Sequence, residues 1–358
     1  MSVLSQFLSG GGYIVRQHTA LLTSSSITVE RNGIALVFLV GGGGSGGQGG
    51  VQGVSAKLRA TGGGAGECAF DFFRVTAGDT ITATIGAGGA SGGTLGTNAA
   101  GNAGTVTTVA GPSGYTITAN PGQGGVLEAS LTLAGGAGGS GGTGGSSNAV
   151  RYEGGRGGSI IQARDDSRAT GGGGVNVFGR TAQTGTAGGD ITGYSGSYGC
   201  ATGGGGSGAP GVQNAGYPST GGGGAGTHSL INTINGGPNY VGGRDALTGT
   251  VIFCNTLGIP CFDGGGSPNF IARTGNGSGG GGQGHVSTAT PNILDAGVFG
   301  GSGGLYLFGT SYAIGGIPGQ GGGSGAAVSI VSGGSTYYGA LAQPGGGGLA
   351  IIAILQQV

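Results

Sequence analysis

Glycine occupies 102 of the 358 positions of this chain, about four times its usual share of roughly 7 per cent. It is concentrated in dense tracts, including GGGGSGGQGG at 41–50, GGAGGSGGTGG at 135–145, GGGSG at 321–325 and GGGG at 345–348. Because glycine has no Cβ, these tracts cannot form helices or sheets held by side-chain packing, and ordering them is entropically costly. An ordered fold therefore requires backbone to pack directly against backbone.

The composition favours order over disorder. Disordered chains are polar and charged, whereas only 7% of this chain is charged and 36% is hydrophobic. No Gly-X-Y period is present, which excludes a collagen triple helix. The remaining solution is the polyproline-II-type helix of polyglycine, with three residues per turn and a rise of about 3.1 Å per residue. Its amides and carbonyls point outward and need partners, so many copies must lie side by side.

Apolar segments with alternating patterns predict β-strands around the tracts. We expect three hairpins. The first covers residues 26–40 and turns at 31–33, where Asn-Gly is a strong hairpin signal. The second covers 68–86 and turns at 77–79, and the third covers 104–120 and turns at 111–114.

The two ends of the pattern mirror each other. An apolar strand at 34–40 runs directly into GGGG at 41–44, and GGGG at 345–348 runs directly into an apolar strand at 349–356. The simplest geometry makes these two strands neighbours in one sheet. The expected fold is mainly β and irregular, with almost no α-helix: an antiparallel base from the N- and C-terminal strands carries a bundle of polyglycine-II helices joined by loops. Residues 1–120 with 349–358 would form the base, with the first glycine helices, and 121–348 the bundle with its loops.

The sequence offers little support for catalysis. His18, His228 and His285 lie in unrelated contexts without the spacing of a metal site or a catalytic triad. A phosphate-binding loop needs a lysine after its glycines, and Lys57, the single lysine, follows alanine. We therefore expect no enzymatic activity, no cofactor and no metal site. The 12 basic and 12 acidic residues balance, which predicts no nucleic-acid partner.

No apolar run is long enough for a membrane-spanning helix, and the N-terminal residues lack the features of a secretory signal. We expect no membrane insertion and no signal peptide.

Two of the four cysteines, Cys254 and Cys261, flank a bend in CNTLGIPC. They could form a disulfide across that bend or remain buried thiols, and the sequence leaves both open.

These segments carry a resemblance. The order IALVFLV, GGGGSGGQGG, FRVTAGDTITATIGAGG and a terminal GGGGLAIIAIL is similar to the glycine-rich domains of bacteriophage tail-fibre adhesins and other receptor-binding tail proteins. The resemblance covers essentially the whole chain and rests on composition and order of segments. It implies a polyglycine-II sandwich whose distal loops bind a receptor on the host surface, in a protein carried on the virion. Similar glycine-rich modules also occur in some animal receptors, and polyglycine-II bundles in certain antifreeze proteins.

One charge cluster gathers seven of the 24 charged residues within 18 positions: Arg151, Glu153, Arg156, Arg164, Asp165, Asp166 and Arg168. It could be a set of solvated ion pairs that holds two adjacent turns, or a polar patch that contacts a receptor. A calcium site at Asp165 and Asp166 is a weaker interpretation, because the spaced carboxylates of such sites are missing.

Tyrosine-bearing loops are the preferred candidates for binding. Tyrosine combines a large contact area with a low entropy cost and a polar tip. The candidate receptor-binding residues are Tyr194, Tyr198, Tyr217 and Tyr240. The competing interpretation is that these rings cap the ends of the glycine bundle.

The leading functional hypothesis is a tail or tail-fibre adhesin, monomeric on a fibre or homotrimeric, that binds a host protein or glycan and contacts other tail proteins. The alternatives are a structural tail or baseplate subunit, and an ice-binding protein. The last would require a flat, regular face of threonine, alanine or serine, against which the bulky, irregular loops argue.

Overall fold

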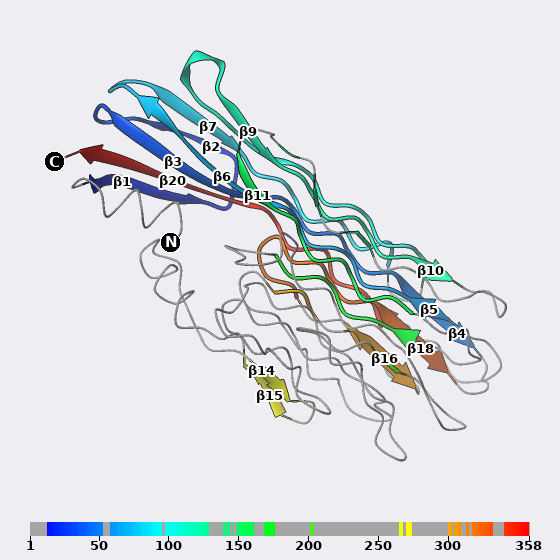
Figure 1. Cartoon of the computed structure of the whole chain (residues 1–358). Helices are drawn as coiled ribbons and strands as arrows, with labels where there is room; N and C mark the ends of the chain where they lie inside the picture. The colour runs from blue at the N-terminus through cyan, green and yellow to red at the C-terminus, as the bar shows by residue number, and fades with distance from the viewer. Residues whose placement is uncertain are drawn as a thin grey trace.

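The structure is a computed structural model that describes residues 13–52, 58–94, 97–128, 139–140, 142–143, 145, 149–160, 168–175, 201–202, 265–267, 270–273, 300–302, 304–308, 313–314, 317–331 and 340–357. Strands gather at one end of the molecule, and a long bundle of extended segments continues from them to a second group of strands at the opposite end (Figure 1). We call the first end the base and the second the far end. The predicted fold class is confirmed: the described chain is mainly β, with antiparallel sheets and a single 3₁₀ turn as its helical element.

A five-stranded antiparallel sheet forms one half of the base. Its strands, in spatial order, are β1 (Tyr13–Leu21), β20 (Leu349–Gln357), β3 (Gly33–Val40), β6 (Cys68–Val75) and β11 (Val150–Tyr152). The predicted pairing of the strands that flank the first and last tracts is confirmed, since β3 and β20 pair from Val40 with Leu349 to Ile34 with Leu355. The register of β1 with β20 shifts between Val15 and Gln17.

A four-stranded antiparallel sheet forms the other half of the base. Its strands are β2 (Ser25–Thr28), β7 (Thr80–Thr84), β8 (Thr107–Ala110) and β9 (Thr116–Ala119), in that order. Alternate residues of the two sheets face one another in a shared apolar core that includes Val37, Leu39, Ile81, Ile117 and Ile352. The base is therefore a β-sandwich, closed by the period-two alternation of its strands.

Two of the three predicted hairpins are wrong in their pairing. The strands of residues 26–40 exist, but β2 pairs with β7 whereas β3 pairs with β20 and β6. Likewise β6 and β7, joined by the predicted turn at 77–79, belong to different sheets. Both connections cross from one sheet to the other, because their inward residues face each other across the core. The third hairpin is confirmed: β8 pairs with β9 across the 3₁₀ turn Pro112–Gly114.

The glycine tracts that the structure describes form rods that are neither α-helical nor paired as β-ladders. Every third amide from Gly41 to Gly47 donates to a carbonyl of segment 61–67, at 2.8–2.9 Å. The amides one position further along donate, again three residues apart, to segment 99–105. This period of three is that of the polyproline-II helix. Segment 41–47 is therefore a polyglycine-II rod, whereas the last residues of its tract, from Gln48, enter strand β4.

The rods pack in a hexagonal array. Rod 41–47 is surrounded by six others, which in order around it are 61–67, 120–126, 99–105, 86–91, 343–348 and 319–326. Each member of this ring is also hydrogen-bonded to the next. Rod 61–67 has its own six neighbours, which are 41–47, 120–126, 139–145, 154–158, 170–175 and 319–326. The lateral bonds give the backbone groups of a rod the partners that buried amides and carbonyls need.

The close approach of the rods explains why glycine is needed. A Cβ added at Gly43 would meet the carbonyl oxygen of Gly322, and one added at Gly64 would meet that of Ser140, both closer than real Cβ atoms come to other atoms. In contrast, a left-handed backbone is not required in most rods. Among the described glycines, only Gly78, Gly114 and Gly321 have a positive φ.

Short strands close the bundle at the far end (Figure 1). One sheet orders β10 (Leu127–Glu128), β5 (Arg59–Ala60), β12 (Arg168–Ala169) and β13 (Ala201–Thr202); a parallel sheet orders β16 (Leu305–Phe308), β18 (Ala327–Val331) and β4 (Gln48–Gln52). A smaller sheet pairs β17 (Ala313–Ile314) with β19 (Ala340–Leu341). The two-stranded sheet of β14 (Gly265–Ser267) and β15 (Phe270–Arg273) lies apart from this end (Figure 1). None of the described segments forms a helix long and apolar enough to cross a bilayer.

Candidate functional site

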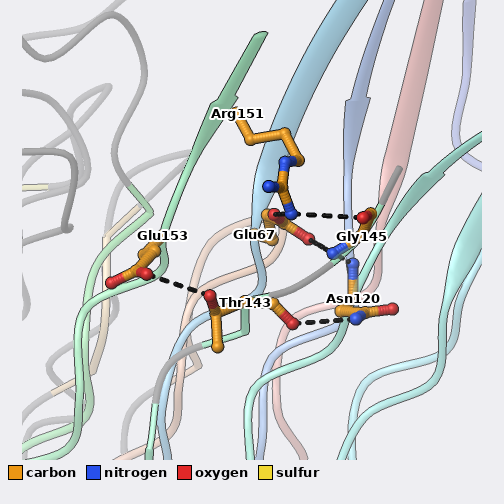
Figure 2. Close-up of polar contacts among 6 residues, drawn as sticks. All are labelled: Glu67, Asn120, Thr143, Gly145, Arg151 and Glu153. Atoms are coloured by element: carbon orange, nitrogen blue, oxygen red, sulfur yellow. Dashed lines mark hydrogen bonds and ion pairs between the residues drawn. The ribbon is translucent and has the colours of Figure 1, made fainter. Parts of the chain in front are cut away.

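A buried carboxylate connects the base to the rods. Glu67 ends rod 61–67 just before β6, and its side chain is 1% exposed. Its Oε2 accepts hydrogen bonds from the backbone amides of Asn120 and Gly145, both at 3.0 Å. Its Oε1 lies 3.6 Å from Nη1 of Arg151, which also donates to the Gly145 carbonyl at 3.1 Å (Figure 2). The carboxylate thus joins three segments that are distant in sequence.

Two further hydrogen bonds extend this cluster toward the surface. Asn120 Nδ2 donates to the Thr143 carbonyl at 2.8 Å, and the Thr143 hydroxyl donates to Glu153 Oε1 at 3.0 Å (Figure 2). We call the six residues Glu67, Asn120, Thr143, Gly145, Arg151 and Glu153 the junction cluster. Each contact holds one segment of the fold to another. The junction cluster therefore stabilises the fold by joining the base to the rods.

A second cluster lies at the β8–β9 hairpin of the base. The rings of Phe73 and Tyr115 stack with centroids 3.9 Å apart, and the Tyr115 hydroxyl donates to Asp71 Oδ2 at 3.0 Å. Burial, together with the nearby Asp71 charge, raises the pKa of Tyr115 far above its usual value. The phenol therefore stays neutral and serves as a hydrogen-bond donor. Burial and the neighbouring Glu67 charge also raise the pKa of the Cys68 thiol, which keeps it in its unreactive protonated form.

The outward face of the four-stranded sheet carries almost only hydroxyl side chains. Its nine outward positions are exposed or half-buried and are Ser26, Thr28, Thr80, Thr82, Thr84, Thr108, Ala110, Thr116 and Thr118. Ser26 Oγ and Thr82 Oγ1 lie 2.8 Å apart on neighbouring strands. The four strands contain no charged residue. We call this surface the hydroxyl face.

The comparisons with known proteins match the chain to a family. A family described as a glycine-rich domain matches residues 19–254, more than half of the chain. The chain belongs to this glycine-rich domain family. No curated protein shows a significant match to its sequence.

The predicted binding residues of the glycine-rich domain, Tyr194, Tyr198, Tyr217 and Tyr240, lie outside the described residues. So do Cys254 and Cys261 and, in the charge cluster, Arg164, Asp165 and Asp166. In the part of the chain that the structure describes, no group of three or more His, Cys, Asp or Glu side chains could hold a metal ion.

The described part of the charge cluster has structural partners. Arg151 reaches the buried Glu67, and Arg156 Nη1 donates to the Gly157 carbonyl at 3.1 Å and to Ser159 Oγ at 2.8 Å. Sequence reasoning left two interpretations of the cluster open, ion pairs that hold adjacent turns or a receptor-contacting patch, and did not select Glu67 as a partner. The available signal was a lone acidic residue between a glycine tract and an apolar strand, in GGGAGECAF.

Proposed function

We propose that this glycine-rich domain is an adhesin of a phage tail or tail fibre, which binds a host-surface receptor through loops held on the rod bundle. The observation that carries the proposal is the hexagonal backbone lattice. Its interior rods are bonded on all sides by neighbouring backbone, so the bundle is a rigid support. Loops held on a rigid support lose little conformational entropy on binding, which favours affinity.

The described side-chain clusters support a binding or structural role over a catalytic one. The junction cluster uses its carboxylate to accept backbone amides, and the Tyr115 phenol is held neutral against Asp71. The position of β13 is also compatible with distal tyrosines. Ala201 begins this strand at the far end, in parallel register with Arg168, and it is the described residue nearest in sequence to Tyr194 and Tyr198.

The proposal is tested by the double variant Tyr194→Ala with Tyr198→Ala, in the full-length protein. We expect it to fold and incorporate into tails normally but to bind the host bacteria at least about tenfold more weakly, as loss of aromatic contact residues does at interfaces. Flow cytometry with labelled protein and whole cells measures the binding. The matched control is Tyr115→Phe at the base, which should bind like the wild type.

Unchanged cell binding by the double variant would contradict the assignment of these tyrosines. If the wild-type protein binds purified virion proteins and not cells, the adhesin proposal fails and the role is that of a structural tail or baseplate subunit. The first outcome would therefore reject the assigned tyrosines, and the second would reject the adhesin function.

A second candidate function is ice binding, and the hydroxyl face favours it. This face supplies the surface that such a protein needs: eight of its nine outward positions are serine or threonine and none is charged. Strands about 4.8 Å apart and outward residues about 6.7 Å apart make the array regular. Thermal hysteresis of the wild-type protein tests this candidate, with Thr82→Glu as the variant expected to abolish it. Absence of hysteresis in the wild type removes the candidate.

A further inference from the structure

Polyglycine rods have an intrinsic problem of axial register. Translating one all-glycine rod along its neighbour by three residues restores every lateral hydrogen bond, because each residue is replaced by an identical one. Such a step moves the rod by about 9 Å. Strands in sheets avoid slippage because a shift exposes their apolar side chains, but glycine offers no such penalty. The strands β3, β6 and β20 restrict the rods that continue them, and within the bundle a residue other than glycine must hold the rods in one register.

Five buried hydroxyl residues lie within about one turn of one another along the bundle. They are Ser45, Thr61, Thr170, Ser302 and Ser324, each with no exposed surface. We call this set the hydroxyl layer. Backbone bonds place its members within about one turn of one another along the rods: the Ser324 amide donates to the Gly44 carbonyl and the Gly47 amide donates to the Thr61 carbonyl.

Each hydroxyl accepts an amide of another rod. Ser324 Oγ accepts from Gly46 at 2.8 Å and donates to the Gln343 carbonyl at 2.6 Å, so it joins three rods. Thr170 Oγ1 also joins three rods, because it accepts from the Gly62 amide at 2.9 Å and donates to the Gly158 carbonyl at 2.6 Å.

The remaining three hydroxyls each accept a backbone amide of another rod as well. Ser45 Oγ accepts from Asn102 at 2.8 Å and donates to the Ala90 carbonyl at 2.7 Å. Thr61 Oγ1 accepts from the Val126 amide, and Ser302 Oγ accepts from the Gly325 amide, both at 2.9 Å. These five amides bond to a hydroxyl of the layer, whereas most other described rod amides that have a partner bond to a backbone carbonyl. The exceptions are Gly86 and Ala87, which donate to Thr107 and Thr105, and Asn120 and Gly145, which donate to Glu67. A shifted register would leave the five amides buried without an acceptor, which is costly.

We infer that the hydroxyl layer sets the axial register of the rods and thereby the height at which the loops emerge from the bundle. Its bonds reach ten of the eleven described rods, which are 41–47, 61–67, 86–91, 99–105, 120–126, 154–158, 170–175, 300–302, 319–326 and 343–348. The eleventh, 139–145, is held instead by the junction cluster, through Gly145 and Thr143. The serines inside the glycine tracts are therefore positioning residues.

The test replaces the three serines of the layer by glycine in the full-length protein: Ser45→Gly, Ser302→Gly and Ser324→Gly together. Glycine fits the lattice, so the rods remain, but only Thr61 and Thr170 are left in the layer to select the register. We expect a second set of glycine amide resonances in the NMR spectrum, at about a tenth of the total intensity or more. The matched control is Ser140→Gly, an exposed serine on rod 139–145, which should give one set.

One set of resonances in the folded triple variant, with only a lower melting temperature, would overturn the inference, because the hydroxyls would then stabilise without selecting a register. If the triple variant does not fold, the single variant Ser324→Gly decides. Its Gly46 amide should exchange with deuterium at least about tenfold faster than in the wild type, as expected for a lost hydrogen bond. Unchanged exchange at Gly46 would equally overturn the inference.

Discussion

Gly346→Ala is expected to lower the free energy of unfolding by about 3 kcal/mol or more, the upper range for overpacking a close-packed interior. The Cβ of alanine at this position would meet the carbonyl oxygen of Gly319. That oxygen belongs to backbone, which cannot swing aside as a side chain can. The two rods must therefore separate, and the lateral hydrogen bonds of Gly346 with Gly43 and Gly322 would be strained or lost.

The next residue of the same tract provides the control. At Gly347, the nearest atom to an added Cβ is the Gly86 carbonyl oxygen at 4.0 Å, an ordinary contact distance, and the position is exposed. Gly347→Ala should therefore leave stability unchanged or raise it slightly, since alanine reduces the entropy of the unfolded chain. Urea denaturation of both variants measures the difference. Equal stability of the two variants would contradict the close packing of the rods.

The contrast between these two neighbours could not have been predicted from sequence. GGGG at 345–348 contains four identical residues, so nothing in the tract itself distinguishes the one that faces a neighbouring rod. The existence of rods was predictable, because a glycine tract in a chain with few charges leaves few ordered alternatives. The neighbours of each rod were not predictable, because glycine tracts are interchangeable as packing partners.

The strands of the base show a second limit of prediction from sequence, which concerns strand pairing. Alternating apolar residues located β2, β3, β6 and β7 correctly, but proximity in sequence suggested the wrong partners for them. Asn32 and Gly33 looked like a hairpin turn, yet neither has the positive φ that such a turn requires. Asn32 Oδ1 accepts instead from the Ala77 amide at 2.8 Å, which ties together the two connections that cross the sandwich. A period of two predicts a half-buried strand and does not identify the sheet to which it belongs.

The candidate sites also differ between sequence and structure. Composition drew attention to aromatic loops and to the densest run of charges. The polar residues with the clearest structural roles in the described chain are instead isolated ones: Glu67, Ser45 and Ser324. Each interrupts a glycine-rich stretch, and each accepts an amide from a rod far away in sequence. An interruption in an otherwise uniform tract is therefore the informative signal in a chain of this kind.

Glu67→Ala is expected to lower the free energy of unfolding by about 3 kcal/mol, because two backbone amides lose their acceptor and Arg151 loses its ion-pair partner. Both amides, of Asn120 and Gly145, donate to the same oxygen, Oε2. The variant should therefore loosen rod 139–145 in particular. Faster hydrogen exchange at Gly145, with smaller changes in rod 41–47, would be the local sign of this effect.

Glu67→Gln separates the acceptor from the charge. The glutamine carbonyl can take the place of Oε2 and accept both amides, so only the ion pair with Arg151 is removed. Arg151 is one-third exposed and lies 3.6 Å from Oε1, and solvent-screened pairs of this kind contribute about 1 kcal/mol or less. We therefore expect Glu67→Gln to retain most of the stability that Glu67→Ala loses, with Glu153→Gln, at an exposed position, as the control. If denaturation instead finds the two Glu67 variants equally unstable, the charge rather than the acceptor holds the base to the rods, because a carbonyl of the same reach would then have failed to replace the carboxylate.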